Sequence, residues 1–172
     1  MIIERQVFRD ERGSFSEVFN KREFEEQISH PFEFVQDNYS RSSRGVLRGL
    51  HYQLPPAAQG KLVCVTRGKI FDVAVDIRRS SPTFGTWVGH ELNEDNPGQL
   101  WVPEGFAHGF LALSEVSDVL YKTTAYYAPD LERSIRWDDP EVGIDWPLGE
   151  EAPILAPKDA AADSLSGADL FD

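Results

Sequence analysis

The residue best placed for chemistry is His51, which ends the segment Arg48-Gly-Leu-His51. This segment resembles a β-strand, in which Arg48 and His51 fall on opposite faces because side chains alternate. A bulge at Gly49 would bring both into one pocket, since glycine inside a strand often marks such an irregularity. A neutral histidine there is suited to accept a proton near pH 7. A histidine in a strand is also commonly a hydrogen-bonded core residue, so both interpretations stay open here.

A second histidine, His108, lies in the segment Trp101-Val-Pro-Glu-Gly-Phe-Ala-His108-Gly-Phe. The glycines and the proline around it predict a turn that brings the backbone close to a ligand. Two histidines on a β-barrel also suggest a transition-metal site. Such a site needs three or four ligands close together, and the residues after His51 are Tyr52, Gln53 and Leu54, which are poor ligands. We therefore expect chemistry without a metal.

A lysine and several tyrosines have two interpretations each. Lys61 follows Gln59-Gly60 at the start of an apolar strand. It is either an edge residue that discourages aggregation or a fixed cation that stabilises an oxyanion. Tyr121 and the pair Tyr126-Tyr127 are either core aromatics or general acids that protonate a carbanion from the face opposite a base. The residue types alone do not decide between these roles.

Short strands must position these side chains. Apolar residues repeat with a period of two in Lys61–Val65, Lys69–Ile77 and Gln99–Pro103. Turn-forming pairs separate the strands, namely Arg67-Gly68, Ser81-Pro82, Glu104-Gly105 and Pro129-Asp130. Many short strands without intervening helical patterns predict an antiparallel sandwich or barrel, and hence an all-β fold.

Segments outside the strands are predicted to be helical or extended. Lys21 to Ile28 is the clearest helix, because Asn20 before it is a favourable N-cap residue. A weaker helix is predicted near Ala160–Ala162. From about residue 147 the chain should form an extended tail laid over the barrel, and we expect residues 1–172 to form a single domain.

Composition narrows the possible partners. The net charge of −12 and the pI near 4.7 argue against a nucleic-acid-binding protein, which needs a basic face, although a few arginines can still hold a small phosphorylated ligand. No apolar run is long enough to span a membrane. The single cysteine, Cys64, lies in an apolar run and is expected to be buried. We expect a cytoplasmic protein.

Two of the predicted strands have apolar residues at consecutive positions, in Leu62–Val65 and Val73–Ile77. Such strands are covered on both faces. A homodimer in which one outer sheet face packs on the partner would explain this coverage.

Six blocks of sequence follow one another from Gln36 to Asp159, and with the N-terminal block Asp10–Glu17 they span nearly the whole chain. They are Gln36-Asp-Asn38-Tyr-Ser40, Gly45-Val-Leu-Arg48-Gly-Leu-His51-Tyr-Gln53, Gln59-Gly-Lys61-Leu-Val, Phe71–Arg78 with Ser81–Trp87, Pro103–Phe110, and Ile154–Asp159. Together these blocks resemble the dTDP-4-dehydrorhamnose 3,5-epimerase family of bacterial deoxysugar synthesis. The resemblance implies a cupin-type antiparallel jelly roll with short flanking helices, a homodimer, and no cofactor or metal.

The resemblance also implies roles for individual residues. His51 falls on the catalytic base of the family and Asp159 on the carboxylate that pairs with it. Lys61 falls on the residue that stabilises the enolate oxygen, and Tyr121 on the proton donor.

Further positions match the substrate-binding residues of the family. Arg48 and Lys158 fall near the diphosphate. Arg12 and Glu17 match an N-terminal block that helps to hold the nucleotide, contributed by the neighbouring subunit. The remaining residues expected to line the cleft are Gln36, Asn38, His108 and Tyr127.

The implied activity is inversion of C3 and C5 of dTDP-4-dehydro-6-deoxy-D-glucose, giving dTDP-4-dehydro-L-rhamnose. A 4-keto group acidifies the hydrogens on both neighbouring carbons, so one base and one opposed acid suffice. Two alternatives remain: an epimerase that inverts C5 or C3 alone, and a non-catalytic cupin that binds a nucleotide-linked sugar.

Overall fold

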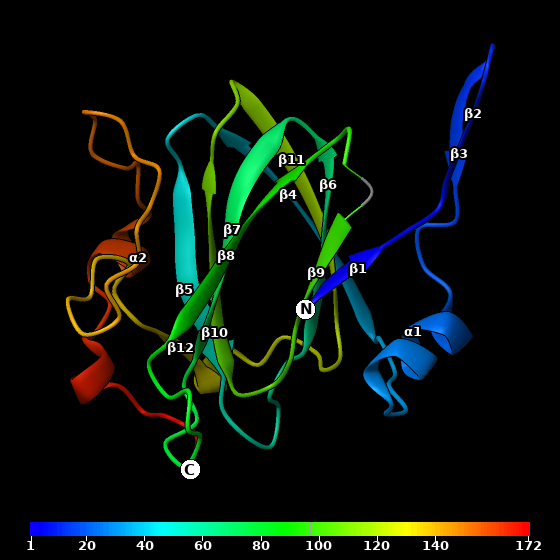
Figure 1. The fold of residues 1–172 in the computed structure, drawn as a ribbon. Helices are drawn as coiled ribbons and strands as arrows, with labels where there is room; N and C mark the ends of the chain where they lie inside the picture. The colour runs from blue at the N-terminus through cyan, green and yellow to red at the C-terminus, as the bar shows by residue number, and fades with distance from the viewer. Residues whose placement is uncertain (97) are drawn as a thin grey trace.

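Two antiparallel β-sheets face each other in the computed structural model, which describes residues 1–96 and 98–172 (Figure 1). The first sheet has the order β1 (Ile2–Glu4), β9 (Gly98–Val102), β6 (Lys61–Arg67), β11 (Val116–Thr123) and β4 (Gln36–Ser43). The second has the order β12 (Glu132–Ser134), β5 (Leu47–Gln53), β10 (Phe106–Ala112), β7 (Lys69–Asp76) and β8 (Trp87–Asn93). From β4 to β12 the chain passes repeatedly between the two sheets. The prediction of an all-β antiparallel jelly roll with short flanking helices is confirmed.

The space between the sheets is apolar in one part and polar in another. Alternation along β6 directs Val63 and Val65 inward, where they pack with Val119 of β11. Lys61 and Tyr121 occupy inward positions on the same two strands and line a cavity. The interior therefore combines an apolar core with a polar pocket.

Other parts of the same chain cover the outer faces of both sheets in part, over β6 and β9 in the first sheet and over β5, β7 and β10 in the second. On the first sheet, Leu62 and Trp101 pack against Phe24 of α1. On the second sheet, β5, β7 and β10 pack against the C-terminal segment, which includes Trp146 and Leu165. Buried Cys64 belongs to β6, as predicted. The explanation of two-faced burial by a partner subunit is therefore wrong, because the chain itself supplies the cover.

The helix α1 spans Lys21–Ile28, as predicted. The side chain of Asn20 accepts hydrogen bonds from the backbone N–H groups of Arg22 and Glu23, which satisfies donors that the first helical turn leaves free. The helix ends at Ser29, whose φ of 55° is left-handed. Among the described residues, no helix has the length and apolar content needed to cross a membrane.

The second helix, α2, spans Pro157–Ala160, so the prediction of a helix near Ala160–Ala162 is wrong in position. Proline suits the first turn, since its missing N–H has no intrahelical partner there, and this favours the earlier start. Short 3₁₀ turns, η1 (Pro129–Leu131) and η2 (Leu165–Gly167), complete the regular structure.

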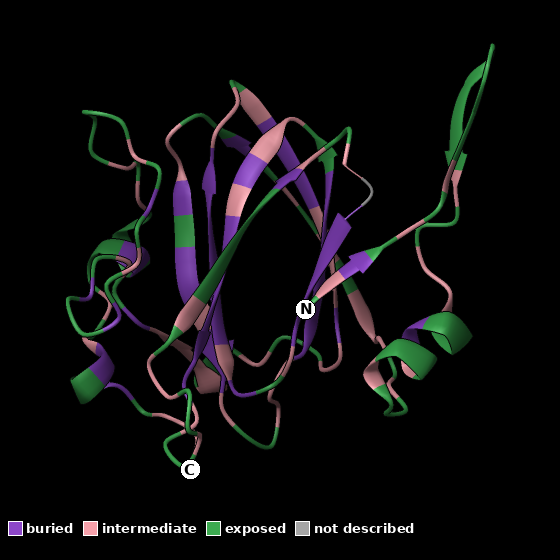
Figure 2. Ribbon diagram, viewed as in Figure 1, coloured by how far each residue is buried: buried purple, intermediate pink, exposed green. Residues whose placement is uncertain are grey.

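The N-terminal hairpin of β2 (Val7–Asp10) and β3 (Gly13–Ser16) extends away from the two sheets (Figure 1). Most of it is exposed (Figure 2), including the large side chains of Phe8 and Phe15. A two-stranded hairpin standing alone is marginally stable in water. This arm therefore contributes little to the core described above.

Candidate active site

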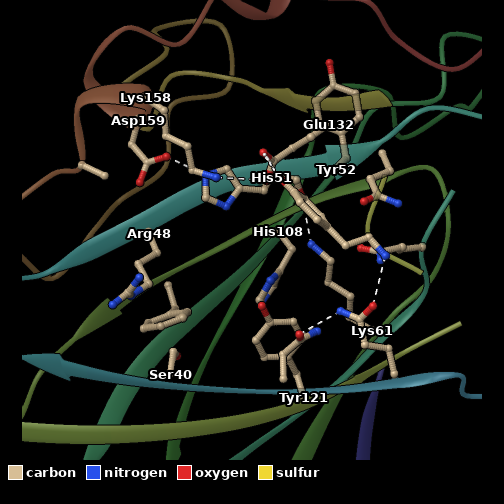
Figure 3. A pocket seen from close by; sticks show the side chains of 17 residues that line it. Ser40, Arg48, His51, Tyr52, Lys61, His108, Tyr121, Glu132, Lys158 and Asp159 are labelled. Carbon is tan, nitrogen blue, oxygen red and sulfur yellow. Dashed lines mark hydrogen bonds and ion pairs between the residues drawn. The ribbon is translucent and has the colours of Figure 1, made fainter. Parts of the chain in front are cut away.

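A cavity of about 340 Å³ opens between the sheets (Figure 3). Ten of the twelve residues predicted for the site line it, namely Gln36, Asn38, Arg48, His51, Lys61, His108, Tyr121, Tyr127, Lys158 and Asp159. Its size falls within the range of small-molecule sites. The structure thus brings together residues that are separated by more than a hundred positions in the sequence.

A bulge in β5 brings Arg48 and His51 to the same cavity, as predicted. His51 pairs with His108 and Arg48 pairs with Phe110, so β5 has one residue more than β10 between these pairs. Gly49 lies at this irregularity with a φ of 126°, and a Cβ atom there would stand 2.5 Å from the Cα of Gly109. Only glycine permits this close approach of the two backbones.

His51 is bound to Asp159, with 2.5 Å between its Nε2 and the carboxylate Oδ1. Asp159 is only 1% exposed and is held on α2, which follows an isolated bridge between Ile154 and Val46. A second bridge joins Asp163 to Ile135, next to the strand residue that pairs with His51. With Nε2 engaged by the carboxylate, Nδ1 is the ring nitrogen left to accept a proton.

Burial lowers the pKa of His51 below its ordinary value of 6.5, because it disfavours the imidazolium form. The Asp159 carboxylate opposes this effect, while the charges of Lys158 and Lys61 add to it. His51 is therefore largely neutral at pH 7, the form in which an imidazole acts as a base.

Lys61 is 7% exposed, and its Nζ donates a hydrogen bond of 3.2 Å to the backbone carbonyl of His51. Burial lowers its pKa from 10.5 to about 8, although the charges of Glu132 and Asp72 oppose the shift. The strand β6 lies between β9 and β11. The interpretation of Lys61 as an edge residue is therefore wrong.

Tyr121 lies on β11, in the sheet opposite His51, and Figure 3 shows the two on opposite sides of the cavity. Burial raises the pKa of Tyr121 above its ordinary value of 10.0, which keeps the phenol protonated at neutral pH. The side chains of Lys61 and His108 lie between His51 and Tyr121 in this view. A group bound in the cavity would have a base, His51, on one side and an acid, Tyr121, on the other.

His108 lies within strand β10, so the prediction of a turn at this position is wrong. Its Nε2 contacts Oδ1 of Asp72 at 2.7 Å, and Asp72 is fully buried. Asp72 was not predicted. The sequence signal was present, because a carboxylate interrupts the apolar run Ile70–Val75 of strand β7 at an inward position.

Glu132 is a second residue of the cavity wall that was not predicted. It accepts hydrogen bonds from Lys158 Nζ at 3.0 Å and from the Tyr127 hydroxyl at 3.1 Å. Nothing in the segment Leu131–Ser134 distinguishes this glutamate from an exposed one. Other lining residues absent from the prediction are Ser40, Tyr52, Gln53, Gln59, Phe110 and Ala156.

Arg12 and Glu17 do not line the cavity. Arg12 is in the turn of the hairpin and pairs with Asp10. Glu17 follows β3 and accepts a hydrogen bond from the Asn20 side chain. Their predicted contact with the nucleotide therefore does not arise within one copy of the chain.

No group of three or more His, Cys, Asp and Glu side chains within residues 1–96 and 98–172 is arranged to hold a metal ion. The two histidines of the cavity are each paired with a single aspartate.

A cupin-type jelly roll whose interior holds acid–base groups is the class that this fold and site define. A family model described as dTDP-4-dehydrorhamnose 3,5-epimerase matches residues 1–167. The epimerase of that name from Pseudomonas aeruginosa is 57% identical over 171 residues, which cover 99% of this chain and 93% of that protein. The chain belongs to the dTDP-4-dehydrorhamnose 3,5-epimerase family, which is a family of isomerases.

Solved structures show the same similarity. The dTDP-6-deoxy-D-glucose-3,5-epimerase of Legionella pneumophila, in complex with dTDP-4-keto-L-rhamnose, matches with a TM-score of 0.94 at 55% identity, covering 98% of this chain and 88% of that one. A 3'-monoepimerase from Streptomyces bikiniensis, in complex with dTDP-quinovose, matches with a TM-score of 0.90 at 34% identity, covering 96% and 83%. The fold is therefore shared by epimerases that differ in which carbon atoms of the sugar they invert.

Titration of His51 by NMR tests the electrostatics of the site. The midpoint should lie below 6.5, because burial disfavours the charged ring. Asp159→Asn should lower it further, since the carboxylate stabilises the imidazolium. Asp72→Asn is the matched control, because that carboxylate contacts His108, and it should leave the His51 midpoint nearly unchanged. A rise of the midpoint in Asp159→Asn would contradict this description.

Proposed function

We propose that this protein inverts C3 and C5 of dTDP-4-dehydro-6-deoxy-D-glucose and so forms dTDP-4-dehydro-L-rhamnose. The observation that carries the proposal is the opposition of His51 and Tyr121, which face one cavity from two different sheets. Inversion at carbon requires a proton to leave from one face and another to arrive on the opposite face. An acid and a base on facing sheets supply this arrangement.

His51 is the base in this mechanism. Its neutral ring takes a proton from the carbon next to the C4 ketone, and Asp159 holds the ring orientation and stabilises the imidazolium that forms. The 2.5 Å contact between the two side chains and the burial of the carboxylate support this role.

Lys61 stabilises the negative charge that develops on the C4 oxygen when the proton leaves. A cation fixed in a cavity sheltered from water does so more effectively than one in solvent, because water does not screen it. By analogy with other oxyanion donors, its loss should reduce turnover by about 10²–10³-fold. Its burial and its hydrogen bond to the His51 carbonyl keep it beside the base.

Tyr121 is the acid that returns a proton from the opposite face. Its raised pKa keeps the proton available, and delivery to the enolate carbon completes the inversion. The proton taken by His51 then leaves to solvent while the tyrosine is reprotonated. The same pair serves C3 and C5, since both carbons flank the ketone.

Substrate binding is assigned to the cationic and amide side chains of the cavity. Arg48 and Lys158 are the cations for the diphosphate, which is favourable because paired phosphates attract fixed positive charge. The Gln36 amide donates to the Asn38 side chain at 2.9 Å, which fixes both side chains on the cavity wall. His108 and Tyr127 complete the binding surface.

The functional protein is a homodimer in this proposal. Arg12 and Glu17 lie on an exposed arm outside the cavity, and a second copy would allow them to reach the nucleotide of the neighbouring subunit. Each chain acts as one domain, because its C-terminal segment supplies Asp159 to the barrel. The unpaired Cys64 agrees with a reducing compartment, and we place the protein in the cytoplasm.

A single-centre epimerase is the second candidate. The similarity in fold to a 3'-monoepimerase supports this candidate, since the same acid and base can act on one carbon alone.

Turnover of the dTDP-linked 4-keto sugar in deuterated water tests the proposal. Solvent deuterium should enter both C3 and C5, because each carbon loses a substrate proton and receives one from a solvent-exchanged group. NMR of the product measures this, and a chelator-treated sample should behave identically. Incorporation at one carbon would favour the single-centre candidate. Binding without incorporation at either carbon would overturn the proposal.

The pH dependence of kcat/KM tests the roles of His51 and Lys61. Activity should fall on the acid side below pH 6.5 as His51 becomes protonated, and on the alkaline side near pH 8 as Lys61 loses its charge. Tyr121 titrates above 10.0 and does not account for the alkaline limb. Lys61→Arg should move that limb upward, because a guanidinium stays charged. An alkaline limb unchanged in Lys61→Arg would refute the assignment.

A further inference from the structure

The loop between β11 and η1 carries two adjacent tyrosines with different surroundings. Tyr126 is 69% exposed and does not line the cavity, whereas Tyr127 does. Residues 124–128 form neither helix nor strand. The Thr124 N–H and the Ala128 carbonyl bond to backbone groups, whereas the Tyr126 carbonyl and the N–H groups of Tyr127 and Ala128 bond to side chains.

One buried side chain supplies such bonds on both sides of Tyr127. Gln53, at the end of β5, is 3% exposed. Its Nε2 donates to the carbonyl of Tyr126 at 3.2 Å, and its Oε1 accepts from the N–H of Ala128 at 2.9 Å. The same Nε2 donates to the carbonyl of Ala57 at 2.7 Å, in the proline-rich loop after β5.

We propose that Gln53 is a positioning residue that fixes Tyr127, and not Tyr126, at the wall of the substrate cavity. The proposal rests on the function proposed above and extends it to a residue that makes its contribution through another side chain. A rotation of the loop that exchanged the two tyrosines would break both bonds that flank Tyr127. Gln53 therefore ties the orientation of this loop to strand β5, which also carries His51.

Other contacts of Tyr127 agree with this fixed orientation. Its N–H donates to Oε1 of Gln36 at 3.1 Å, and its hydroxyl donates to Glu132, which also holds Lys158. The bond to Glu132 raises the pKa of the Tyr127 phenol. Displacement of the loop would thus disturb the anion-binding lysine as well as the tyrosine.

The geometry requires an amide at position 53. A glutamine side chain offers two N–H donors and one carbonyl acceptor, which match the two carbonyls and the one N–H that it meets. A glutamate retains the acceptor but loses both donors, and a methionine of similar length makes none of the three bonds. These substitutions therefore separate hydrogen bonding from side-chain volume.

Calorimetric binding of dTDP tests the proposal without requiring turnover. Gln53→Met should raise the Kd by about tenfold, as should Tyr127→Ala, while the double variant should bind no more weakly than Tyr127→Ala alone. Tyr126→Ala, which removes the neighbouring aromatic ring and leaves the backbone bonds intact, is the matched control and should leave the Kd unchanged. Should Gln53→Met fail to fold, Gln53→Glu should give the same direction of change.

Two outcomes would overturn the role of Gln53. One is an unchanged Kd in the folded Gln53 variants. The other is a double variant whose loss equals the product of the two single losses, because Gln53 would then act independently of Tyr127. Either result leaves deuterium exchange at C3 and C5 untouched. Conversely, coupling between Gln53 and Tyr127 in an enzyme without such exchange would overturn the proposed reaction alone.

Discussion

The contact between His51 and Asp159 joins a strand in the first third of the chain to a short helix near its end, 108 residues later. A carboxylate buried as deeply as that of Asp159 is unfavourable unless a partner compensates it. His51 is that partner. Asp159 is held beside it because the C-terminal segment is anchored on both sides of α2, at Ile154 and at Asp163. The site is therefore complete only when the last part of the chain lies against the barrel.

The cavity has an energetic cost that the rest of the fold must offset. Lys61, Asp72 and Asp159 are all buried, where charged groups lose their hydration. Apolar packing outside the cavity balances this loss, in the core between the sheets and in the two clusters on their outer faces. The aromatic side chains around Trp101 and the apolar C-terminal segment therefore supply part of the free energy that offsets the burial of these charged groups.

Local features of the sequence predicted the scaffold well. Period-two patterns located β6, β7 and β9, Asn20 marked the start of α1, and Gly49 marked the bulge. The dyad of His51 and Asp159 followed from the family resemblance, since no local pattern connects residues so distant in sequence. Asp72 stands out as a carboxylate in an apolar run, but its role depends on His108, which becomes its neighbour only when β7 and β10 pair.

Residues whose partners lie on irregular segments were the hardest to predict. Glu132 and Gln53 gain their significance from loops that fold onto them, and neither has a distinctive sequence context. The helix near the C-terminus was predicted too late in the chain, because the alanines after Asp159 favour helix while Pro157 sets its start. The contacts of Arg12 and Glu17 depend on a second copy of the chain and stay a prediction.

In the proposed mechanism a base on one sheet and an acid on the other act on opposite faces of the sugar. Turnover of Tyr121→Phe in deuterated water tests it most directly, because this variant keeps His51 and loses the opposing acid. Deuterium should still enter the substrate while its configuration is retained, since His51 alone removes and returns the proton. His51→Asn should show no exchange. Inversion at wild-type rates in Tyr121→Phe, or a loss of exchange in a folded Tyr121→Phe with normal dTDP binding, would show that Tyr121 is not the opposing acid.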